Sequence, residues 1–249
     1  MAGHSHWAGI KRKKAVVDAR RGKVFAKLIR GIEVAAREGG TSNPENNMTL
    51  AAAIERAKEA SCPVDTIEKA AKRGAGELDE GLRYERVVYE GYAPGGVALL
   101  VETLTENRNR TGSDVRAVFA RGGGSIGEPG SVAWMFERKG VVLVRGDAAE
   151  DDVLTAAAEG GAEDAHRSGD AWEIVCELKD FGAVRDAVKG AGLPVESADL
   201  AMIPTTTMDL DADAARKVLR LVDVLEDLDD VQVVSTNFNV SDEVFAQIS

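Results

Sequence analysis

The first regular pattern in the chain is that of an amphipathic helix running from about Asp18 to Glu38 and ending at Gly39-Gly40. Its apolar side chains recur every three or four residues, which places them on one face of a helix. They are Phe25, Leu28, Ile29, Ile32, Ala35 and Ala36. A row of cations has the same spacing and, at about 100° per residue, lies roughly opposite the apolar row. It consists of Arg20, Lys23, Lys27 and Arg30. One face can therefore pack on the protein while the other meets phosphates.

Two shorter helices are predicted next, at about Met48–Ala60 and Asp65–Arg73. The segment Ser61-Cys62-Pro63 separates them, and Asp65 with Glu68 resembles a capping box. Two helices across a short break are also typical of a DNA-reading helix-turn-helix. Helical hairpins are common, however, and the second helix mixes acidic with basic residues. We therefore favour a packing hairpin over a recognition helix.

Strand patterns begin after residue 82. Residues 83–92 and 97–104 are rich in β-forming side chains, and the turn residues between them, Ala93-Pro94-Gly95-Gly96, predict a hairpin. A helix from about Thr111 to Arg121 follows and ends at three glycines. From Val132 to Val144 the pattern is again that of a strand, interrupted at Arg138-Lys139-Gly140.

The elements expected between residues 141 and 202 have the β-α-β-β-α-β order of a ferredoxin-like unit. Strands are expected near 141–144, 162–165, 172–176 and 195–202, and helices near 150–159 and 181–191. A strand, a helix and a strand near 205–210, 213–228 and 231–238 form half of a second unit, which the hairpin and helix at 84–121 can complete. The predicted fold class is therefore α+β, with an N-terminal three-helix domain and two ferredoxin-like α/β domains, one inserted in the other.

The expected domain boundaries follow from this order. Residues 1–80 form a basic helical domain with an N-terminal arm. Residues 81–135 and 204–249 form a discontinuous α/β domain, and residues 136–203 form the inserted ferredoxin-like domain.

The composition is that of an ordinary globular protein, with 44% hydrophobic and 29% charged residues among 249. No apolar run approaches the roughly 20 residues needed to cross a bilayer, and no apolar signal core follows the basic N-terminus. Cys62 and Cys176 lie far apart, without the paired spacing of a zinc site or a disulfide framework. We expect a cytoplasmic protein that has no membrane partner.

Charge is distributed very unevenly along the chain. Residues 1–37 contain ten Lys and Arg against two acidic residues, a net charge of +8, so the other 212 residues carry −19 of the total of −11. Such a basic segment on an acidic body indicates a polyanion-binding segment, the alternative being a solvated charged tail. The candidate nucleic-acid contacts are Lys11, Arg12, Lys13, Lys14, Arg20, Arg21, Lys23, Lys27 and Arg30. Trp7 is a candidate for stacking on a base, worth ~1–3 kcal/mol, or for packing against the helical domain.

No motif in the chain predicts catalysis. The segment Gly122–Gly127, GGGSIG, matches a dinucleotide-binding and a nucleophile-elbow pattern, but it follows a helix, whereas both motifs follow a strand. We therefore expect Ser125 to lie in a structural loop. The sequence has no Walker-type loop, no H-E-x-x-H and no Cys/His cluster, so we expect no enzyme activity, no metal, no cofactor and no small-molecule substrate. Adjacent acids such as Asp229-Asp230 are expected to be helix-end or surface carboxylates.

Two arginines leave two interpretations open. Arg108 and Arg110 lie just before the helix expected at Thr111. They are suited to a second contact with an anion. They are equally suited to pairing with Glu102, Glu106 or the acidic domains.

Long blocks of the chain resemble the YebC/PmpR family of bacterial regulators. The blocks are AGHSHWAGIKRKKAVVDARRGKVFAKLIRGIEVAAREGG, KRGAGE, YEGYAPGGVALLVETLTENRNRT, GGGSIGEPGSVAWMFERKGV and RLVDVLEDLDDVQVVSTNF. The resemblance covers about residues 2 to 240 and is far more specific than a short motif. It implies an N-terminal helical domain and two α/β domains, one inserted in the other. Two departures are visible: His6 stands where the family usually has Lys, and Ala71 where Ile is usual.

The resemblance also implies a non-enzymatic, nucleic-acid-binding regulator of gene expression. Many members are described as DNA-binding transcriptional regulators, whereas others, like the related mitochondrial translational activators, act in translation on the ribosome. The chain has no convincing base-reading helix and no dimer zipper, which favours ribosomal RNA as the partner, with basic ribosomal proteins facing the acidic body. Promoter DNA is the alternative partner, and a protein–protein adaptor is a weaker alternative function.

Overall fold

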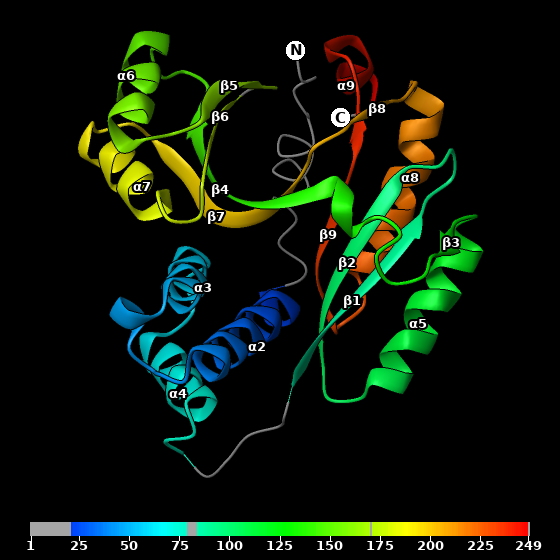
Figure 1. Cartoon of the computed structure of the whole chain (residues 1–249), viewed down its shortest axis with the longest axis horizontal. Helices are drawn as coiled ribbons and strands as arrows, with labels where there is room; N and C mark the ends of the chain where they lie inside the picture. The colour runs from blue at the N-terminus through cyan, green and yellow to red at the C-terminus, as the bar shows by residue number, and fades with distance from the viewer. Residues whose placement is uncertain (1–20, 79–83, 170, 249) are drawn as a thin grey trace. The chain divides into compact units, whose positions relative to one another are not determined.

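The computed structural model describes residues 21–78, 84–169 and 171–248, which form two compact units (Figure 1). Within the described residues, the first unit contains residues 21–132 and 218–235, and the second unit contains residues 133–217 and 236–248. The helical N-terminal region followed by α/β domains confirms the predicted α+β class. The division into three domains at residues 80, 135 and 203 stays a prediction. No helix in the described ranges is long and apolar enough to span a membrane.

The first unit begins with three packed helices. They are α2 (Arg21–Gly39), α3 (Met48–Glu59) and α4 (Val64–Gly74), with a short 3-10 turn, η2 (Pro44–Asn46), before α3. Their shared core contains the apolar face predicted for α2, including Ile32 and Ala36, together with Leu50 and Ile67. A Cβ at Gly74 would lie 2.2 Å from the carbonyl oxygen of Glu33. Glycine at this position therefore allows α4 to approach α2 closely.

The ends of these helices confirm one expectation and correct another. Gly40 has φ of 64°, the left-handed conformation that ends a helix, as the Gly39-Gly40 pair predicted. The prediction of a capping box at Asp65 is wrong. Helix α4 starts one residue earlier, with Pro63 at the N-cap and no side-chain cap, so Asp65 lies inside the first turn. Proline fixes its own φ and cannot continue a helix backward, so it sets this start in place of a carboxylate.

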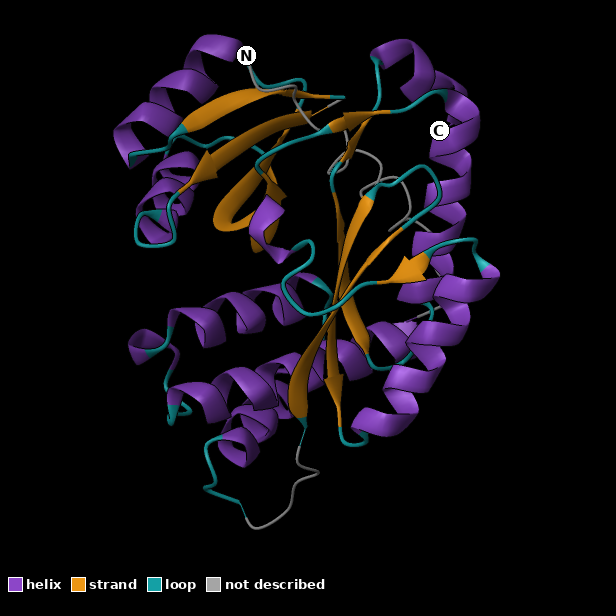
Figure 2. Ribbon diagram, turned by 45° about the vertical axis from the view of Figure 1, so that its right-hand side comes forward, coloured by secondary structure: helices purple, strands orange, loops and turns teal. Residues whose placement is uncertain are grey.

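The four-stranded sheet of the first unit has the strand order β3-β1-β2-β9. Its strands are β1 (Glu85–Tyr92), β2 (Ala98–Thr105), β3 (Ser125–Ile126) and β9 (Val231–Thr236). The predicted hairpin is confirmed, because β1 and β2 pair antiparallel over their whole length. Two helices lie beside the sheet (Figure 2): α5 (Arg108–Arg121) and α8 (Ala212–Glu226), which belongs to this unit from Val218. A Cβ at Gly124 would meet both Phe119 of α5 and Leu221 of α8.

The second unit confirms the ferredoxin-like order. Its elements are β4 (Phe136–Arg145), α6 (Glu150–Gly160), β5 (Asp164–Ser168), β6 (Ala171–Cys176), α7 (Phe181–Gly190) and β7 (Val195–Pro204). The strands form one antiparallel sheet in the order β5-β6-β4-β7. The interruption predicted at Arg138-Lys139-Gly140 is wrong, since these residues pair in register with Leu200–Met202 of β7. Glycine is required there by packing: a Cβ at Gly140 would lie 2.6 Å from Phe181.

The C-terminal part of the chain differs from the prediction in two places. The strand expected at 205–210 is only β8 (Met208–Asp209), which pairs in parallel with β10 (Phe238–Asn239) outside both four-stranded sheets. The short β3 occupies the edge next to β1 instead. The chain also ends in a helix, α9 (Asp242–Ile248), that the sequence pattern did not predict.

Candidate nucleic-acid interface

The predicted nucleic-acid contacts are only partly within the described structure. Trp7 and the cations Lys11, Arg12, Lys13, Lys14 and Arg20 lie outside the described residues. Arg21 and Lys23 belong to the first turn of α2, where only the backbone is described. Two of the nine candidate cations, Lys27 and Arg30, are therefore placed with their side chains, and the whole set stays a prediction.

Lys27 and Arg30 contact the turn between α8 and β9. Lys27 Nζ donates to the carbonyl oxygen of Glu226, the last residue of α8, at 2.6 Å. A cation at this position is stabilised by the negative end of the helix dipole. Arg30 Nη1 donates to the carbonyl oxygen of Asp229 at 2.7 Å and lies 3.3 Å from Asp230 Oδ1. Its guanidinium also lies over the ring of Tyr84, 5.2 Å from the centroid. These two cations hold α2 against the first unit's sheet.

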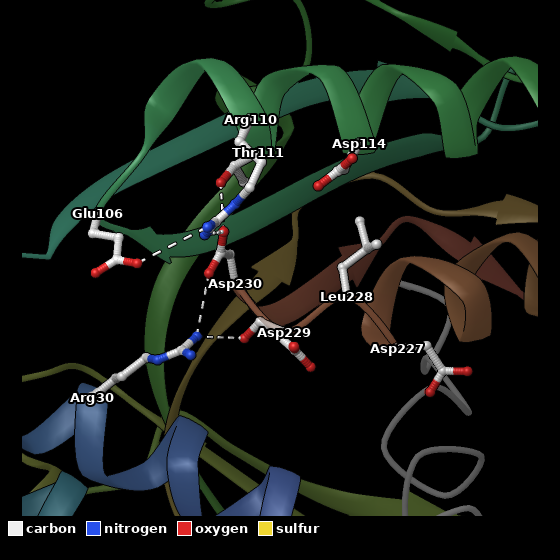
Figure 3. A pocket seen from close by; sticks show the side chains of 9 residues that line it. All are labelled: Arg30, Glu106, Arg110, Thr111, Asp114, Asp227, Leu228, Asp229 and Asp230. Atoms are coloured by element: carbon white, nitrogen blue, oxygen red, sulfur yellow. Dashed lines mark hydrogen bonds and ion pairs between the residues drawn. The ribbon is translucent and has the colours of Figure 1, made fainter.

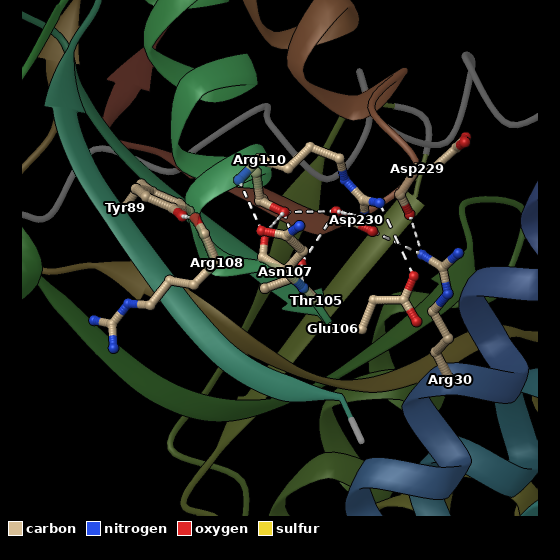
Figure 4. A network of polar contacts seen from close by, with 10 residues as sticks. Arg30, Tyr89, Thr105, Glu106, Asn107, Arg108, Arg110, Asp229 and Asp230 are labelled. Carbon is tan, nitrogen blue, oxygen red and sulfur yellow. Dashed lines mark hydrogen bonds and ion pairs between the residues drawn. The ribbon is translucent and has the colours of Figure 1, made fainter. Parts of the chain in front are cut away.

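Asp230 is the centre of a polar network that joins four segments of the first unit (Figure 4). The Thr111 hydroxyl donates to Asp230 Oδ2 at 2.6 Å, Arg110 Nη2 donates to the same oxygen at 2.9 Å, and the Thr105 hydroxyl lies at 3.3 Å. Burial alone would raise the pKa of Asp230, but the hydrogen bonds from Thr111 and Arg110 and the charge of Arg30 together hold it below its usual value. Asp230 is therefore a buried, charged carboxylate.

The position of Asp230 corrects a prediction from the sequence. Asp229 is exposed, as expected of a surface carboxylate, but Asp230 is only 7% exposed. No local pattern distinguishes the two residues, because the partners of Asp230 are 119 to 200 residues away in the chain. The one available signal was the strand predicted to start at Val231, since the residue before a buried strand is often enclosed by its neighbours.

A cleft of about 460 Å³ lies beside this network (Figure 3). It is lined by Arg30, Glu106, Arg110, Thr111, Asp114, Asp227, Leu228, Asp229 and Asp230. Five carboxylates face two guanidinium groups, and both guanidinium groups pair with Asp230. The cleft is therefore net acidic, which disfavours a phosphate inside it. In the described segments, no three or more His, Cys, Asp or Glu side chains are arranged so that they could hold a metal ion.

The structure distinguishes Arg108 from Arg110, for which the sequence left two interpretations open. Helix α5 starts at Arg108, three residues earlier than predicted, because the Asn107 side chain accepts from the backbone N–H of Arg110 and caps it. Arg110 pairs with Asp230 and lies 3.9 Å from Glu106. For Arg110, pairing with acids is therefore confirmed. Arg108 points away from the network (Figure 4).

The remaining motifs behave as structural elements. Gly122–Gly127 follows α5 and enters the short edge strand β3, so Ser125 lies on no strand-to-helix turn. In the helical hairpin, Arg73 of α4 pairs with the buried Glu33 of α2 at 2.5 Å. Burial raises the pKa of Glu33, against the lowering effect of Arg73. The exposed face of α4 retains Glu68 beside Lys69 and Lys72, a mixture that does not suit a groove lined with phosphates.

Comparison with known proteins identifies the family. Residues 5–77 match the family profile described as the TACO1/YebC protein N-terminal domain, and residues 84–238 match the TACO1/YebC second and third domain. The chain belongs to the TACO1/YebC family. The resemblance found in the sequence is thereby confirmed.

Relatives of this TACO1/YebC chain match it over its full length. A protein from Thermobifida fusca is 56% identical over 250 residues, covering all of both chains. One from Mycobacterium tuberculosis is 54% identical over 249 residues, covering all of this chain and 99% of the other. Both are named probable transcriptional regulatory proteins. The crystal structure of a conserved hypothetical protein from Aquifex aeolicus is 47% identical, with a TM-score of 0.84 over 95% of this chain and 98% of the other.

Proposed function

We propose that this protein is a non-enzymatic regulator of gene expression that binds nucleic acid, acting on the ribosome through contacts with RNA. The observation that carries the proposal is the separation of charge, with +8 on residues 1–37 and −19 on the other 212 residues. A basic segment neutralises backbone phosphates and releases their counterions, while an acidic body limits non-specific adhesion to nucleic acid.

The proposed phosphate contacts are Lys11, Arg12, Lys13, Lys14, Arg20, Arg21, Lys23, Lys27 and Arg30, with Trp7 stacking on a base. Lys27 and Arg30 have protein partners in the free molecule, so each exchanges a contact with the α8–β9 turn for a phosphate. This exchange makes their net contribution to affinity smaller than that of cations without such partners.

RNA is preferred to DNA because none of the described helices of the first unit is suited to reading bases. In α4, Arg73 is paired with Glu33, and the exposed face alternates in charge. A DNA-reading helix instead presents a row of polar and cationic side chains to the major groove. The acidic body suits a ribosomal site where it faces basic ribosomal proteins.

DNA-binding transcriptional regulation is the second candidate function. The relatives from Thermobifida fusca and Beutenbergia cavernae are named probable transcriptional regulatory proteins, which favours it. Both candidates are regulators of gene expression and neither requires covalent chemistry. The segment Gly122–Gly127, which matches a nucleophile-elbow pattern in sequence, lies between a helix and an edge strand. This position agrees with a function without covalent chemistry.

The test is sedimentation of the untagged protein from cell lysate through a sucrose gradient, at low and moderate salt, with and without DNase. Co-migration with ribosomal particles that survives DNase and is lost when Lys11–Lys14 are changed to alanine supports the proposal. The matched control replaces four exposed cations elsewhere, Lys69, Lys72, Lys179 and Lys217, and should co-migrate like the wild type.

Two other results would contradict ribosomal action. Migration at the top of the gradient, with salt-sensitive recovery of discrete promoter fragments, supports the transcriptional alternative. Full function in cells of the Lys11–Lys14 variant would point to a protein adaptor, because the basic segment would then be dispensable.

A further inference from the structure

Two of the arginines without a partner among the described residues share one helix in a strongly acidic part of the protein. Most arginine side chains in the described ranges have a hydrogen bond or an ion pair. The exceptions are Arg108, Arg116, Arg138 and Arg220, all exposed. Arg108 and Arg116 belong to the same helix.

Helix α5 brings these two side chains to one face. Arg108, Gly112 and Arg116 are separated by four residues each, the spacing of neighbours on a helix surface. Arg116 turns back toward Gly112, because its Nη1 lies 3.5 Å from the position that a Cβ at Gly112 would take. The same Cβ position lies 3.3 Å from the hydroxyl oxygen of Tyr89. Gly112 is itself buried, so glycine at this position lets Tyr89 and Arg116 pack over the middle of this face.

Tyr89 of β1 contacts this face of α5. Its hydroxyl donates to the carbonyl oxygen of Arg108 at 3.3 Å. Burial raises the pKa of Tyr89, while the charges of Arg108 and Arg116 act in the opposite direction. The acids that act on the phenol are Glu85 and Asp230, and Asp230 is already paired with Arg110 and Arg30. The arginine face of α5, defined as Arg108, Arg116 and Tyr89, is thus a local cationic surface.

Figure 4 shows why this face is separate from the acidic cleft. Arg108 and Arg110 leave the first turn of α5 in different directions, Arg110 toward Asp230 and Arg108 away from it. The first turn of α5 also carries the positive end of the helix dipole, which favours an anion near Arg108. Arg110 thus makes an internal contact, whereas Arg108 belongs to an exposed surface.

We propose that the arginine face of α5 is a second phosphate-binding surface, which contacts the backbone of the same nucleic acid that the N-terminal cations bind. This inference rests on the proposed function. Guanidinium groups bind phosphate through two parallel N–H donors, and these two have no carboxylate partner that would compete with a phosphate. A single phosphodiester strand supplies such anions at regular intervals. Arg110 contributes nothing to this surface because Asp230 holds it.

The test is fluorescence anisotropy with two labelled probes, a single-stranded RNA and a duplex DNA of about 24 nucleotides or base pairs, across a salt series. Arg108→Gln with Arg116→Gln removes two contacts, so the slope of log K against log salt should fall by about one to two. The matched control is Arg138→Gln with Arg220→Gln, which removes the same charge from other exposed, unpaired positions. The control should keep the wild-type slope within about half a unit.

The possible failures are distinguishable. Absence of salt-dependent binding of either probe by the wild-type protein overturns the proposed function and this inference with it. Wild-type binding with the same slope in the Arg108/Arg116 variant and in the control overturns this inference alone. A thermal melt checks folding, and Arg108→Lys with Arg116→Lys should recover most of the lost slope. Loss of slope that lysine does not restore would mean that the charge of this surface is not what binds.

Discussion

Asp230 and Glu173 are buried carboxylic acids with opposite electrostatic environments. Asp230 immediately precedes β9 in the first unit and receives hydrogen bonds from two threonines and two arginines. Glu173 lies in β6 of the second unit, opposite His166 of β5. Burial raises its pKa to about 7, with a hydrogen bond from Ser168 as the opposing influence. Its Oε2 has no hydrogen-bond partner within the described residues.

The difference shows that the partners, more than burial itself, decide whether an enclosed carboxyl stays charged. Both residues are less than 10% exposed. Burial penalises the charged form of each, but only Asp230 receives donors that compensate for the lost water. Asp230 can therefore join α2, α5 and the start of β9. Ionisation of Glu173 in the folded protein therefore costs free energy.

The largest effect is expected from Asp230→Asn. The change leaves Arg30 and Arg110 without their carboxylate and should lower the free energy of unfolding by about 3 kcal/mol, less than for a fully enclosed pair because Arg110 is half exposed. Urea unfolding at pH 7 followed by circular dichroism measures it. Because the pKa of Asp230 is lowered in the folded state, its contribution is present above the unfolded pKa and is lost as pH falls. The deficit of the variant should therefore shrink in acid.

Asp229→Asn is the matched control for that experiment. It removes the same charge from the adjacent, exposed residue and keeps the backbone carbonyl that Arg30 contacts. Its effect should stay below about 1 kcal/mol. Equal losses of stability from the two variants would mean that any negative charge in the α8–β9 turn stabilises the fold. The hydrogen bonds to Asp230 would then not explain its difference from Glu173.

Glu173→Gln should have the opposite effect on stability. A pKa raised in the folded state means that the folded protein binds more protons than the unfolded chain, so stability is full below the unfolded pKa and falls as pH rises through about 7. Glutamine removes that loss. The stability of the variant relative to the wild type should therefore rise by about 2 kcal/mol between pH 5 and pH 8.

The comparison is made by urea unfolding of both proteins from pH 5 to pH 8. Glu159→Gln, at an exposed position of α6, supplies the control for the loss of one acidic side chain and should change stability little. A Glu173→Gln variant that is less stable than the wild type at pH 8 would show that the ionised carboxylate is stabilised in place, as Asp230 is.

The fold was largely predictable because hydrophobic periodicity is a local property. The face of α2 that contains Ile32 and Ala36, the β1–β2 hairpin and the β-α-β-β-α-β order could all be read from spacing and turn residues. The errors occur where distant contacts decide. Gly140 looked like an interruption of β4, but Phe181 of α7 packs where a Cβ of residue 140 would lie. The expected strand at 205–210 shrank to Met208–Asp209, whose partner is the short β10.

The polar site was less predictable for a physical reason. A cation in a sequence can meet a phosphate or a carboxylate, and only the folded chain shows which acids come near it. Arg108 and Arg110 have the same local surroundings in the sequence, yet only Arg110 reaches Asp230. Charge counting located the basic segment, and the structure showed that two of its members, Lys27 and Arg30, already have partners.

The smallest effect, and the sharpest test of the Asp230 network, comes from Lys27→Gln with Arg30→Gln. These changes remove the contacts to Glu226, Asp229 and Asp230, so the free energy of unfolding should fall by about 1 kcal/mol. The same variant should weaken binding to the RNA probe less than Lys13→Gln with Lys14→Gln does. The reason is that wild-type Lys27 and Arg30 give up protein contacts when they bind phosphate. An equal loss of affinity together with unchanged stability would show that α2 presents these cations to the nucleic acid and that Asp230 does not hold them.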